Sequence, residues 1–271
     1  MAILMCRPDF FGVEYEINPW MHVENQVDAT LAVSQWDALH QVYLEMGEEI
    51  ELLAPIKGLP DMVFTANAGV VWNNTVVLSR FHHAERQGEE AHFQRFFEAR
   101  GMRVLTLDRG VSMEGAGDFL FVGDRLFAGY GFRTDVETHQ VVADLLGVEV
   151  VSLQLIDSRF YHLDTCFCPL DDQTVLFDPN AFTVESVARI RELVPRLVEA
   201  PEAVAAGFAC NALALGRTVV ASSAIEGVAA PLAELGFAVK GLPMTEFMKS
   251  GGGVRCLTLP LQLGRVAAAS N

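Results

Sequence analysis

The sequence predicts an α/β fold in which five strand-strand-helix-strand units close into a propeller-like ring. First, a pattern of two apolar strands, a helix and a third strand returns at intervals of roughly 35–50 residues, as in repeat architectures. Second, the chain begins and ends with partial units that complete each other. Third, no Ser/Pro/Gly-rich linker divides the chain, so we expect a single domain over residues 1–271.

Four units are complete within the chain, and each opens on a hairpin of two short strands. The hairpins are predicted at 63–81, 118–130, 164–178 and 211–223. The helices are predicted at 87–101, 134–147, 183–200 and 224–236. The closing strands are predicted at 103–107, at 148–155, in the short run after residue 200, and at 237–242. Turn residues Asn73-Asn74 and Gly123-Asp124 fix the first two hairpins.

The fifth unit is predicted to be split between the two ends of the chain. The run 254–261 would pair with 2–8, followed by a helix over 24–47 and a strand over 49–54. Such pairing would close the ring and remove exposed sheet edges. An open α/β sheet is the competing architecture, but no G-x-G-x-x-G motif follows any predicted strand.

Charge and hydropathy narrow the classes of partner. The net charge is −16 and the chain has no Lys/Arg run, which argues against binding to nucleic acid or to an anionic membrane surface. The first ten residues do not resemble a signal peptide, and no apolar stretch reaches about 18 residues. We expect a cytoplasmic protein with a small-molecule substrate, and a homo-oligomer is possible.

The five cysteines predict neither a disulfide framework nor a metal site. They are Cys6, Cys166, Cys168, Cys210 and Cys256. An odd number of scattered cysteines argues against disulfides, and Cys166-x-Cys168 lacks the spacing of zinc ligands. Packing is the favoured interpretation of that pair, with a thiol redox protein as the alternative. We expect no metal and no cofactor.

The segment KSGGGVRC, residues 249–256, is the first candidate for chemistry. Three consecutive glycines are usually kept where the backbone needs unusual dihedrals or approaches a ligand closely. Cys256 follows them at the start of an apolar strand. A flexible turn beside a buried thiol is the alternative. A nucleophilic cysteine needs a proton-handling partner, for which His162 is the candidate, while His82 and His83 lie in a polar stretch.

Carboxylates gather just before the first strands of three units. They are Asp61, Glu114, Asp118 and Asp164. In a closed ring these positions would face one another, and converging carboxylates repel unless a cation lies between them. A guanidinium group is such a cation, because its planar N–H donors match carboxylates. Turn capping explains any one of these acids but not their shared position.

Two arginines are candidates to bind a substrate carboxylate. Arg86 and Arg133 follow the first and second hairpins. Arginine pairs with carboxylates through two parallel hydrogen bonds. A surface salt bridge is the alternative for each of them.

These residues together resemble the guanidino-group-modifying enzymes over essentially the whole chain. That superfamily includes arginine deiminases, dimethylarginine dimethylaminohydrolases, amidinotransferases and arginine dihydrolases. The segments EYEINPWM, DMVFTANAG, ERQGEE, FYHLDTCFCPL and EFMKSGGGVRCLTL most resemble the cyanobacterial-type arginine dihydrolases. The resemblance implies a five-bladed α/β propeller. It also adds Asn18 and Asn67 to the site, and Asn67 stands where deiminases and dimethylarginine hydrolases usually carry an acid.

The resemblance implies a role for each candidate. Cys256 would be the nucleophile, His162 the general acid and base, and Glu114, Asp118, Asp61 and Asp164 the guanidinium-binding acids. Arg86 and Arg133 would bind the substrate carboxylate. The expected reaction converts L-arginine to ornithine, ammonia and carbon dioxide. Dimethylarginine hydrolase, deiminase, amidinotransferase and a non-catalytic arginine-binding protein remain alternatives, and residues 87–90 and Gly251–Gly253 are candidate lids.

Overall fold

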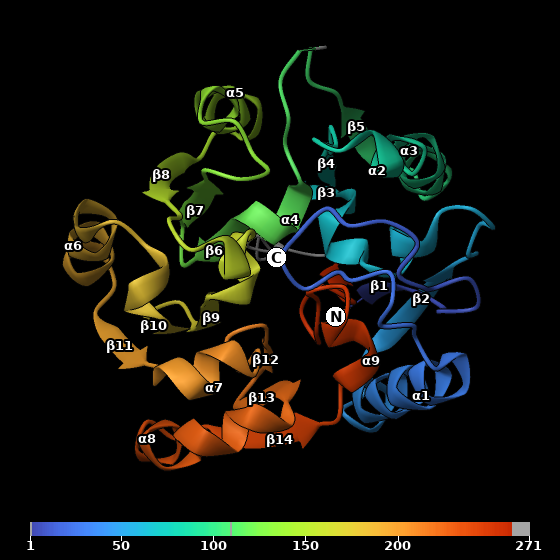
Figure 1. Cartoon of the computed structure of the whole chain (residues 1–271). Coiled ribbons are helices and arrows are strands. Elements are labelled where there is room, and N and C mark those ends of the chain that lie inside the picture. Colours follow the sequence, from blue (N-terminus) through green and yellow to red (C-terminus); the bar gives the residue numbers. More distant parts are fainter. Residues whose placement is uncertain (1, 109, 262–271) are drawn as a thin grey trace, which may run out of the picture.

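Five three-stranded sheets stand around a central axis in the computed structural model, which describes residues 2–108 and 110–261 (Figure 1). The predicted domain, 1–271, extends beyond these residues at both ends. In each sheet the middle strand pairs antiparallel with the first strand and parallel with the third. This shared topology confirms the five predicted strand-strand-helix-strand units.

The complete units follow in chain order. The first two sheets contain β3 (Gly69–Trp72), β4 (Thr75–Leu78), β5 (Arg103–Leu105), β6 (Phe119–Val122), β7 (Arg125–Tyr130) and β8 (Glu149–Gln154). The next two contain β9 (Phe167–Asp171), β10 (Thr174–Phe177), β11 (Arg196–Glu199), β12 (Leu213–Leu215), β13 (Thr218–Ser222) and β14 (Ala238–Leu242). The first two hairpins turn at the predicted residues, where Asn73 and Gly123 adopt positive φ.

The fifth sheet joins the two ends of the chain, as predicted. It contains β15 (Leu259–Pro260), β1 (Ala2–Cys6) and β2 (Glu49–Leu53). Leu4 lies opposite Leu259 in the antiparallel pair. Every residue of β1 is buried, which is typical of a strand covered on both faces.

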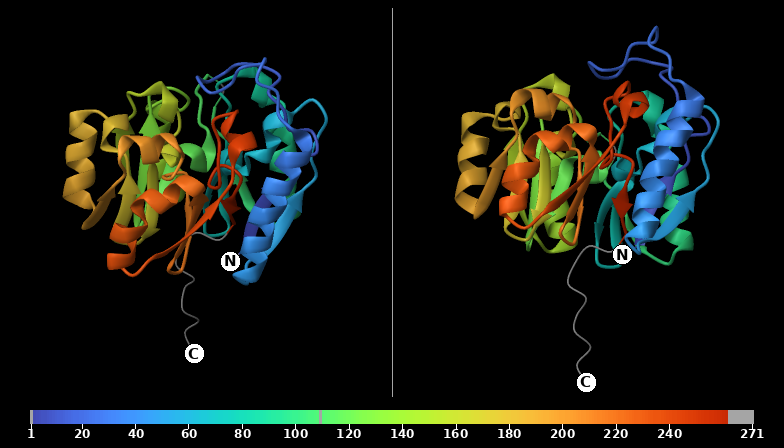
Figure 2. Two further views of the ribbon diagram at one scale, coloured as in Figure 1. Left: turned by 60° about the horizontal axis from the view of Figure 1, so that its bottom comes forward. Right: turned by 90° about the horizontal axis from the view of Figure 1, so that it is seen from below.

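A helix crosses from the middle to the third strand of each sheet, because parallel strands need such a crossover. These helices are α1 (Ala29–Glu45), α3 (Glu90–Ala99), α5 (Glu137–Leu146), α6 (Val184–Leu193) and α8 (Ala229–Glu234). They lie on the outside of the ring (Figures 1 and 2). The helix predicted at 24–47 begins only at Ala29, since the Asp28 side chain accepts from the first-turn amides. The helix predicted at 183–200 ends at Leu193, because Pro195 cannot continue it, and the closing strand predicted after residue 200 is β11, which lies before that residue.

Short helical segments fill the connections. They are α2 (Ala84–Gln87), α4 (Gly115–Asp118), α7 (Glu202–Ala206), α9 (Thr245–Met248), η1 (Pro60–Val63), η2 (Thr65–Ala68), η3 (Ser158–Phe160), η4 (Leu163–Thr165), η5 (Pro179–Ala181) and η6 (Ser223–Val228). Three of them, η2, α4 and η4, stand directly before β3, β6 and β9. They therefore deliver side chains from successive sheets to one end of the ring.

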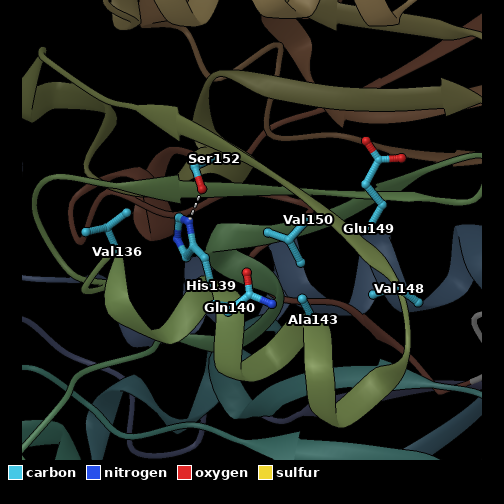
Figure 3. Close-up of a pocket in the computed structure, with 8 residues that line it drawn as sticks. All are labelled: Val136, His139, Gln140, Ala143, Val148, Glu149, Val150 and Ser152. Carbon is cyan, nitrogen blue, oxygen red and sulfur yellow. Dashed lines mark hydrogen bonds between the residues drawn. The ribbon is translucent and has the colours of Figure 1, made fainter.

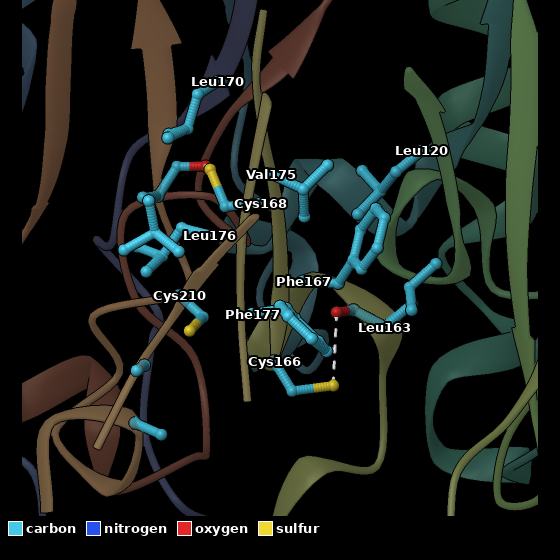
Figure 4. Packing of buried hydrophobic residues seen from close by; sticks show 14 of the residues in the cluster. Leu120, Leu163, Cys166, Phe167, Cys168, Leu170, Val175, Leu176, Phe177 and Cys210 are labelled. Carbon is cyan, nitrogen blue, oxygen red and sulfur yellow. Dashed lines mark hydrogen bonds between the residues drawn. The ribbon is translucent and has the colours of Figure 1, made fainter. Parts of the chain in front are cut away.

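All five cysteines are buried and free of disulfides. Cys166 and Cys168 pack with Cys210 in a large apolar cluster that extends over the second, third and fourth sheets (Figure 4). The Cys168 thiol donates to the carbonyl of Ala212, 3.3 Å away. This confirms the packing interpretation of the C-x-C pair. No helix among the described residues is long and apolar enough to cross a bilayer.

A buried histidine in the second unit makes stability depend on pH. His139 lines a pocket between α5 and β8, with Ser152 Oγ 2.7 Å from its Nδ1 and Gly129 O 3.3 Å from its Nε2 (Figure 3). A carbonyl only accepts, so Nε2 carries the proton and Nδ1 accepts from Ser152. Burial lowers the pKa of His139 from 6.5 to about 4.

We expect the His139→Gln variant to resist acid better than the wild type. Between about pH 6.5 and pH 4 the unfolded chain protonates this histidine and the folded chain does not. The free energy of unfolding therefore falls as the pH falls through that window, by about 3 kcal/mol in total. Urea unfolding of both proteins at pH 7.5 and pH 4 measures the difference. An equal loss of stability in the two proteins would contradict this assignment.

Candidate active site

The predicted site residues come together at one end of the ring, where they are nearly all buried. Cys256, His162, Glu114, Asp61, Asn67, Arg86, Asp118, Arg133 and Asp164 are each at most 4% exposed. The segment between β1 and α1 lies across this end (Figures 1 and 2). Four of its residues hydrogen-bond to the groups beneath, namely Tyr15, Ile17, Asn18 and Trp20.

Cys256 lies between an acid and an amide. Its Sγ is 3.4 Å from Oδ2 and 3.6 Å from Oδ1 of Asp164, and 3.0 Å from Nδ2 of Asn211. Burial raises the pKa of the Cys256 thiol well above its ordinary value, and the Asp164 carboxylate raises it further. Burial also raises the pKa of Asp164 to about 7. The raised pKa favours the protonated sulfur, which donates to Asp164.

His162 is held by a carboxylate that stays ionised. Its Nε2 is 2.7 Å from Oε2 of Glu114, and the same oxygen accepts from Nη1 of Arg133 at 3.0 Å. Burial by itself would raise the pKa of Glu114, but Arg133 and His162 hold that pKa well below its usual range. Glu114 therefore orients the imidazole and can stabilise its protonated form.

Asp118 belongs to the cluster, but both of its oxygens are already used. Oδ2 accepts from the Thr134 hydroxyl at 2.6 Å, and Oδ1 accepts from the backbone N–H of Leu163 at 3.0 Å. Thr134 Oγ1 in turn accepts from the Glu114 backbone N–H. Asp118 thus ties α4 to the loop that carries His162. This geometry favours a structural connection over direct contact with a guanidinium.

Arg86 is paired internally rather than left open for a ligand. Its Nε and Nη2 donate to the two carboxylate oxygens of buried Glu89, at 2.9 and 2.8 Å. Its Nη1 donates to Oδ1 of Asn67 at 2.8 Å, and Nη2 also reaches the carbonyl of Asp61. The nitrogen of the same Asn67 amide, Nδ2, donates to the backbone carbonyl of Glu114 at 3.3 Å. Arg86 thereby fixes which way the Asn67 amide faces.

Asp61 has a carboxylate oxygen available for a cation. Oδ2 accepts from the Tyr15 hydroxyl at 2.9 Å, whereas Oδ1 is buried and has no hydrogen-bond partner within residues 2–108 and 110–261. Burial raises the pKa of Asp61 above its ordinary value. We expected Asp61 to stand just before the first strand of its unit, but it lies in η1, and η2 separates it from β3. Asn67, in η2, holds the position next to that strand.

The glycine run is packed tightly rather than open. A Cβ on Gly251, which has a φ of +75°, would lie 2.8 Å from the rings of both Trp20 and Tyr161, and one on Gly252 would lie 2.4 Å from Phe64. Asn18 Nδ2 donates to the carbonyl of Ser250 at 3.0 Å. Glycine is needed here because these aromatic rings pack directly against the backbone of residues 251 and 252. Of the two candidate lids, Gly251–Gly253 is buried beneath the segment between β1 and α1.

Several residues of the site were not singled out from the sequence. They are Tyr15, Glu89, Thr134, Tyr161 and Asn211. A signal existed for one of them, since Asn211 stands just before the first strand of its unit, as Asp118 and Asp164 do. Of the alternative histidines, half-buried His83 is near enough to the cluster for the charges of Arg133 and Glu114 to act on it, and burial lowers its pKa. His82 is exposed, and it is its backbone N–H that reaches Glu114.

Comparison with known proteins places this arrangement in a family. Residues 11–263 match the family described as N,N dimethylarginine dimethylhydrolase, eukaryotic. The chain is 47% identical over 96% of its length to the bifunctional arginine dihydrolase/ornithine cyclodeaminase ArgZ of Synechocystis, and covers 37% of that protein. It is 44% identical over 95% of its length to the N(G),N(G)-dimethylarginine dimethylaminohydrolase of Mycobacterium tuberculosis, and covers 84% of it.

A solved structure agrees in fold. It is the N-terminal domain of ArgZ, a cysteine-to-serine mutant bound to substrate, with a TM-score of 0.94 and 46% identity over 97% of this chain and 98% of that one. By contrast, the chain covers 37% of the length of each of the two full-length cyanobacterial relatives. The chain belongs to the N,N-dimethylarginine dimethylhydrolase family, one of the guanidino-group-modifying families that its motifs resemble.

Proposed function

We propose that the chain is an arginine dihydrolase, which hydrolyses L-arginine to ornithine, two ammonia and carbon dioxide through a covalent adduct on Cys256. The observation that carries this proposal is a buried cluster in which the Cys256–Asp164 pair lies beside the His162–Glu114 pair. The identity to ArgZ and the substrate-bound structure of its N-terminal domain support the same substrate and products.

The guanidinium would lie among Asp61, Glu114 and Asp164. The open oxygen of Asp61 favours a cation at that place. Of the two arginines expected to bind the α-carboxylate, Arg133 is the one that would do so, because the donors of Arg86 are used by Glu89, Asn67 and Asp61. Arg133 now donates to the carbonyl of Ile17, so a carboxylate would take over that contact when the covering segment opens.

The bound guanidinium prepares the nucleophile. Its positive charge beside Sγ favours the thiolate. The thiol proton passes to Asp164, to which the thiol already donates. The thiolate forms a bond to the guanidinium carbon, the C–N bond to one amino group breaks, and His162 protonates the departing ammonia. His162 then accepts a proton from water, which displaces the sulfur and yields a ureido group. A second hydrolysis releases another ammonia and carbon dioxide, so that two water molecules are consumed in all.

Asn67 is the residue that favours the second hydrolysis. Its amide both donates and accepts hydrogen bonds, which suits a neutral ureido intermediate, whereas a carboxylate only accepts. A dimethylarginine dimethylaminohydrolase is the second candidate, because the Mycobacterium tuberculosis relative has that name and is 44% identical. Deiminase and dimethylarginine hydrolase would both give citrulline. An amidinotransferase would need an amine acceptor, and a pure arginine-binding protein would have no use for a nucleophile.

We expect the purified protein to convert L-arginine to ornithine with two ammonia per arginine, without added metal or nucleotide. Quantifying ornithine, citrulline and ammonia in one reaction tests this expectation. Replacing Cys256 with serine should lower turnover by at least about 1,000-fold, since no thiolate remains to attack. Cys210→Ser, which alters a buried cysteine of the core, is the matched control and should retain turnover.

Other products would revise the proposal in defined ways. Citrulline with one ammonia would retain the cysteine mechanism and contradict the dihydrolase. Citrulline and dimethylamine from dimethylarginine, with arginine unused, would favour the second candidate. Normal turnover by Cys256→Ser would show that Cys256 is not the nucleophile.

We expect Asn67→Asp to release more citrulline than the wild type. The variant keeps the acceptor that faces Arg86 but loses the donor, so the ureido intermediate is held less well before the second attack. Loss of one buried hydrogen bond predicts about a 10-fold fall in the ratio of ornithine to citrulline. Asn74→Asp, in an exposed hairpin turn, is the control for added charge. An unchanged ratio in Asn67→Asp would exclude this role for Asn67.

A further inference from the structure

Asn211 contacts the sulfur of Cys256, and neither the motifs nor the expected roles of the site residues include it. It stands just before β12 in the fourth unit and is fully buried. Its Nδ2 lies 3.0 Å from Sγ of Cys256 and 3.0 Å from the backbone carbonyl of Asp164. Its amide therefore bridges the nucleophile and the loop that carries the neighbouring acid.

The orientation of this amide is fixed by its four partners. Oδ1 accepts from the backbone N–H groups of Arg255 at 3.0 Å and of Cys256 at 3.3 Å. A backbone N–H cannot accept a hydrogen bond, so exchanging the oxygen and nitrogen would set donors against donors. The N–H therefore faces the sulfur.

We propose that Asn211 is a catalytic residue whose amide N–H donates to Cys256 Sγ and stabilises the thiolate during attack on the substrate. This inference rests on the proposed cysteine mechanism and adds a residue to it. A neutral donor stabilises a negatively charged sulfur more than a neutral thiol, because hydrogen bonds to ionised acceptors are stronger. Ionised Asp164 cannot serve in this way, since its charge raises the pKa of the Cys256 thiol; only after it has taken the thiol proton is it a second donor beside Asn211.

The surroundings of Sγ leave few other groups for this task. Asp164 and Tyr161 are titratable groups that interact with Cys256. Burial raises the pKa of the Cys256 thiol and Asp164 raises it further, whereas hydrogen bonds from the Gly253 backbone and from Asn211 lower it. Tyr161 donates its hydroxyl to the carbonyls of Ser250 and Gly251.

The Asn211→Asp variant separates thiolate stabilisation from positioning. The new carboxylate still accepts from the backbone of Arg255 and Cys256, but it cannot donate to Sγ. We expect alkylation of Cys256 by iodoacetamide to be slower by about 10-fold or more at pH 8, and its pH midpoint to be about one unit higher or more. With arginine as substrate, kcat should fall by a similar factor and KM should change less.

The direction of the change distinguishes this role from a structural one. A residue that only packs would, when replaced, loosen the pocket and speed alkylation. Peptide mass spectrometry assigns the label to Cys256, and Asn74→Asp is the matched control for charge. Should Asn211→Asp not fold, the similarly sized Asn211→Leu also lacks the donor and should also react more slowly. Alkylation by a folded variant at the wild-type rate or faster would overturn the proposal.

Failure of this inference and failure of the proposed function give different results. The alkylation rate needs no substrate, so it reports on Asn211 even if arginine is not turned over. Slower alkylation in the variant, together with a wild-type protein that leaves arginine unchanged, would support Asn211 and reject the arginine substrate. Turnover of arginine by the wild type, together with unchanged alkylation of the Asn211 variant, would support the arginine substrate and reject the role of Asn211.

Discussion

The burial of ionisable side chains at one end of the ring is the constraint on which the rest of the site depends. Arg86, Glu89, Glu114 and Arg133 are each at most 4% exposed. An ionised group at that depth costs several kcal/mol unless a partner compensates for its lost hydration. The structure pairs Arg86 with Glu89, and Arg133 with Glu114. Because arginine offers its donors in a fixed plane, these pairs also set the positions of Asn67 and His162.

The carboxylates of the site fall into two electrostatic groups. Cationic neighbours keep the pKa of Glu114 low, so it is a permanent anion that holds His162. Burial raises the pKa of Asp61 and brings that of Asp164 to about 7, although Arg86, 4.0 Å from Asp61, and Arg255 lower these two pKa values in part. Environments that push similar groups in opposite directions are typical of sites that divide acid and base roles. A guanidinium would supply the missing positive charge, and with it the condition for a thiolate on Cys256.

Ring closure is what brings these groups together. The first strands of the sheets stand around the axis, and the short helices before β3, β6 and β9 present Asn67, Asp118 and Asp164 at the same end. The segment between β1 and α1 completes the enclosure from above. Its Ile17 carbonyl accepts from Arg133, which also holds Glu114. One arginine therefore links this segment to the carboxylate that holds His162.

The sequence by itself determined the five units, the split fifth sheet, and many of the residues that gather at one end of the ring. It could do so because strand and helix periods are local and because equivalent positions of a repeat meet on one axis. Only the tertiary structure decided how the buried charges are shared. Arg86 pairs with Glu89, Asp118 is used by Thr134 and Leu163, and Asn211 reaches the sulfur. These partners come from different sheets or depend on the direction in which a side chain points. The spacing of residues along the sequence specifies neither of these.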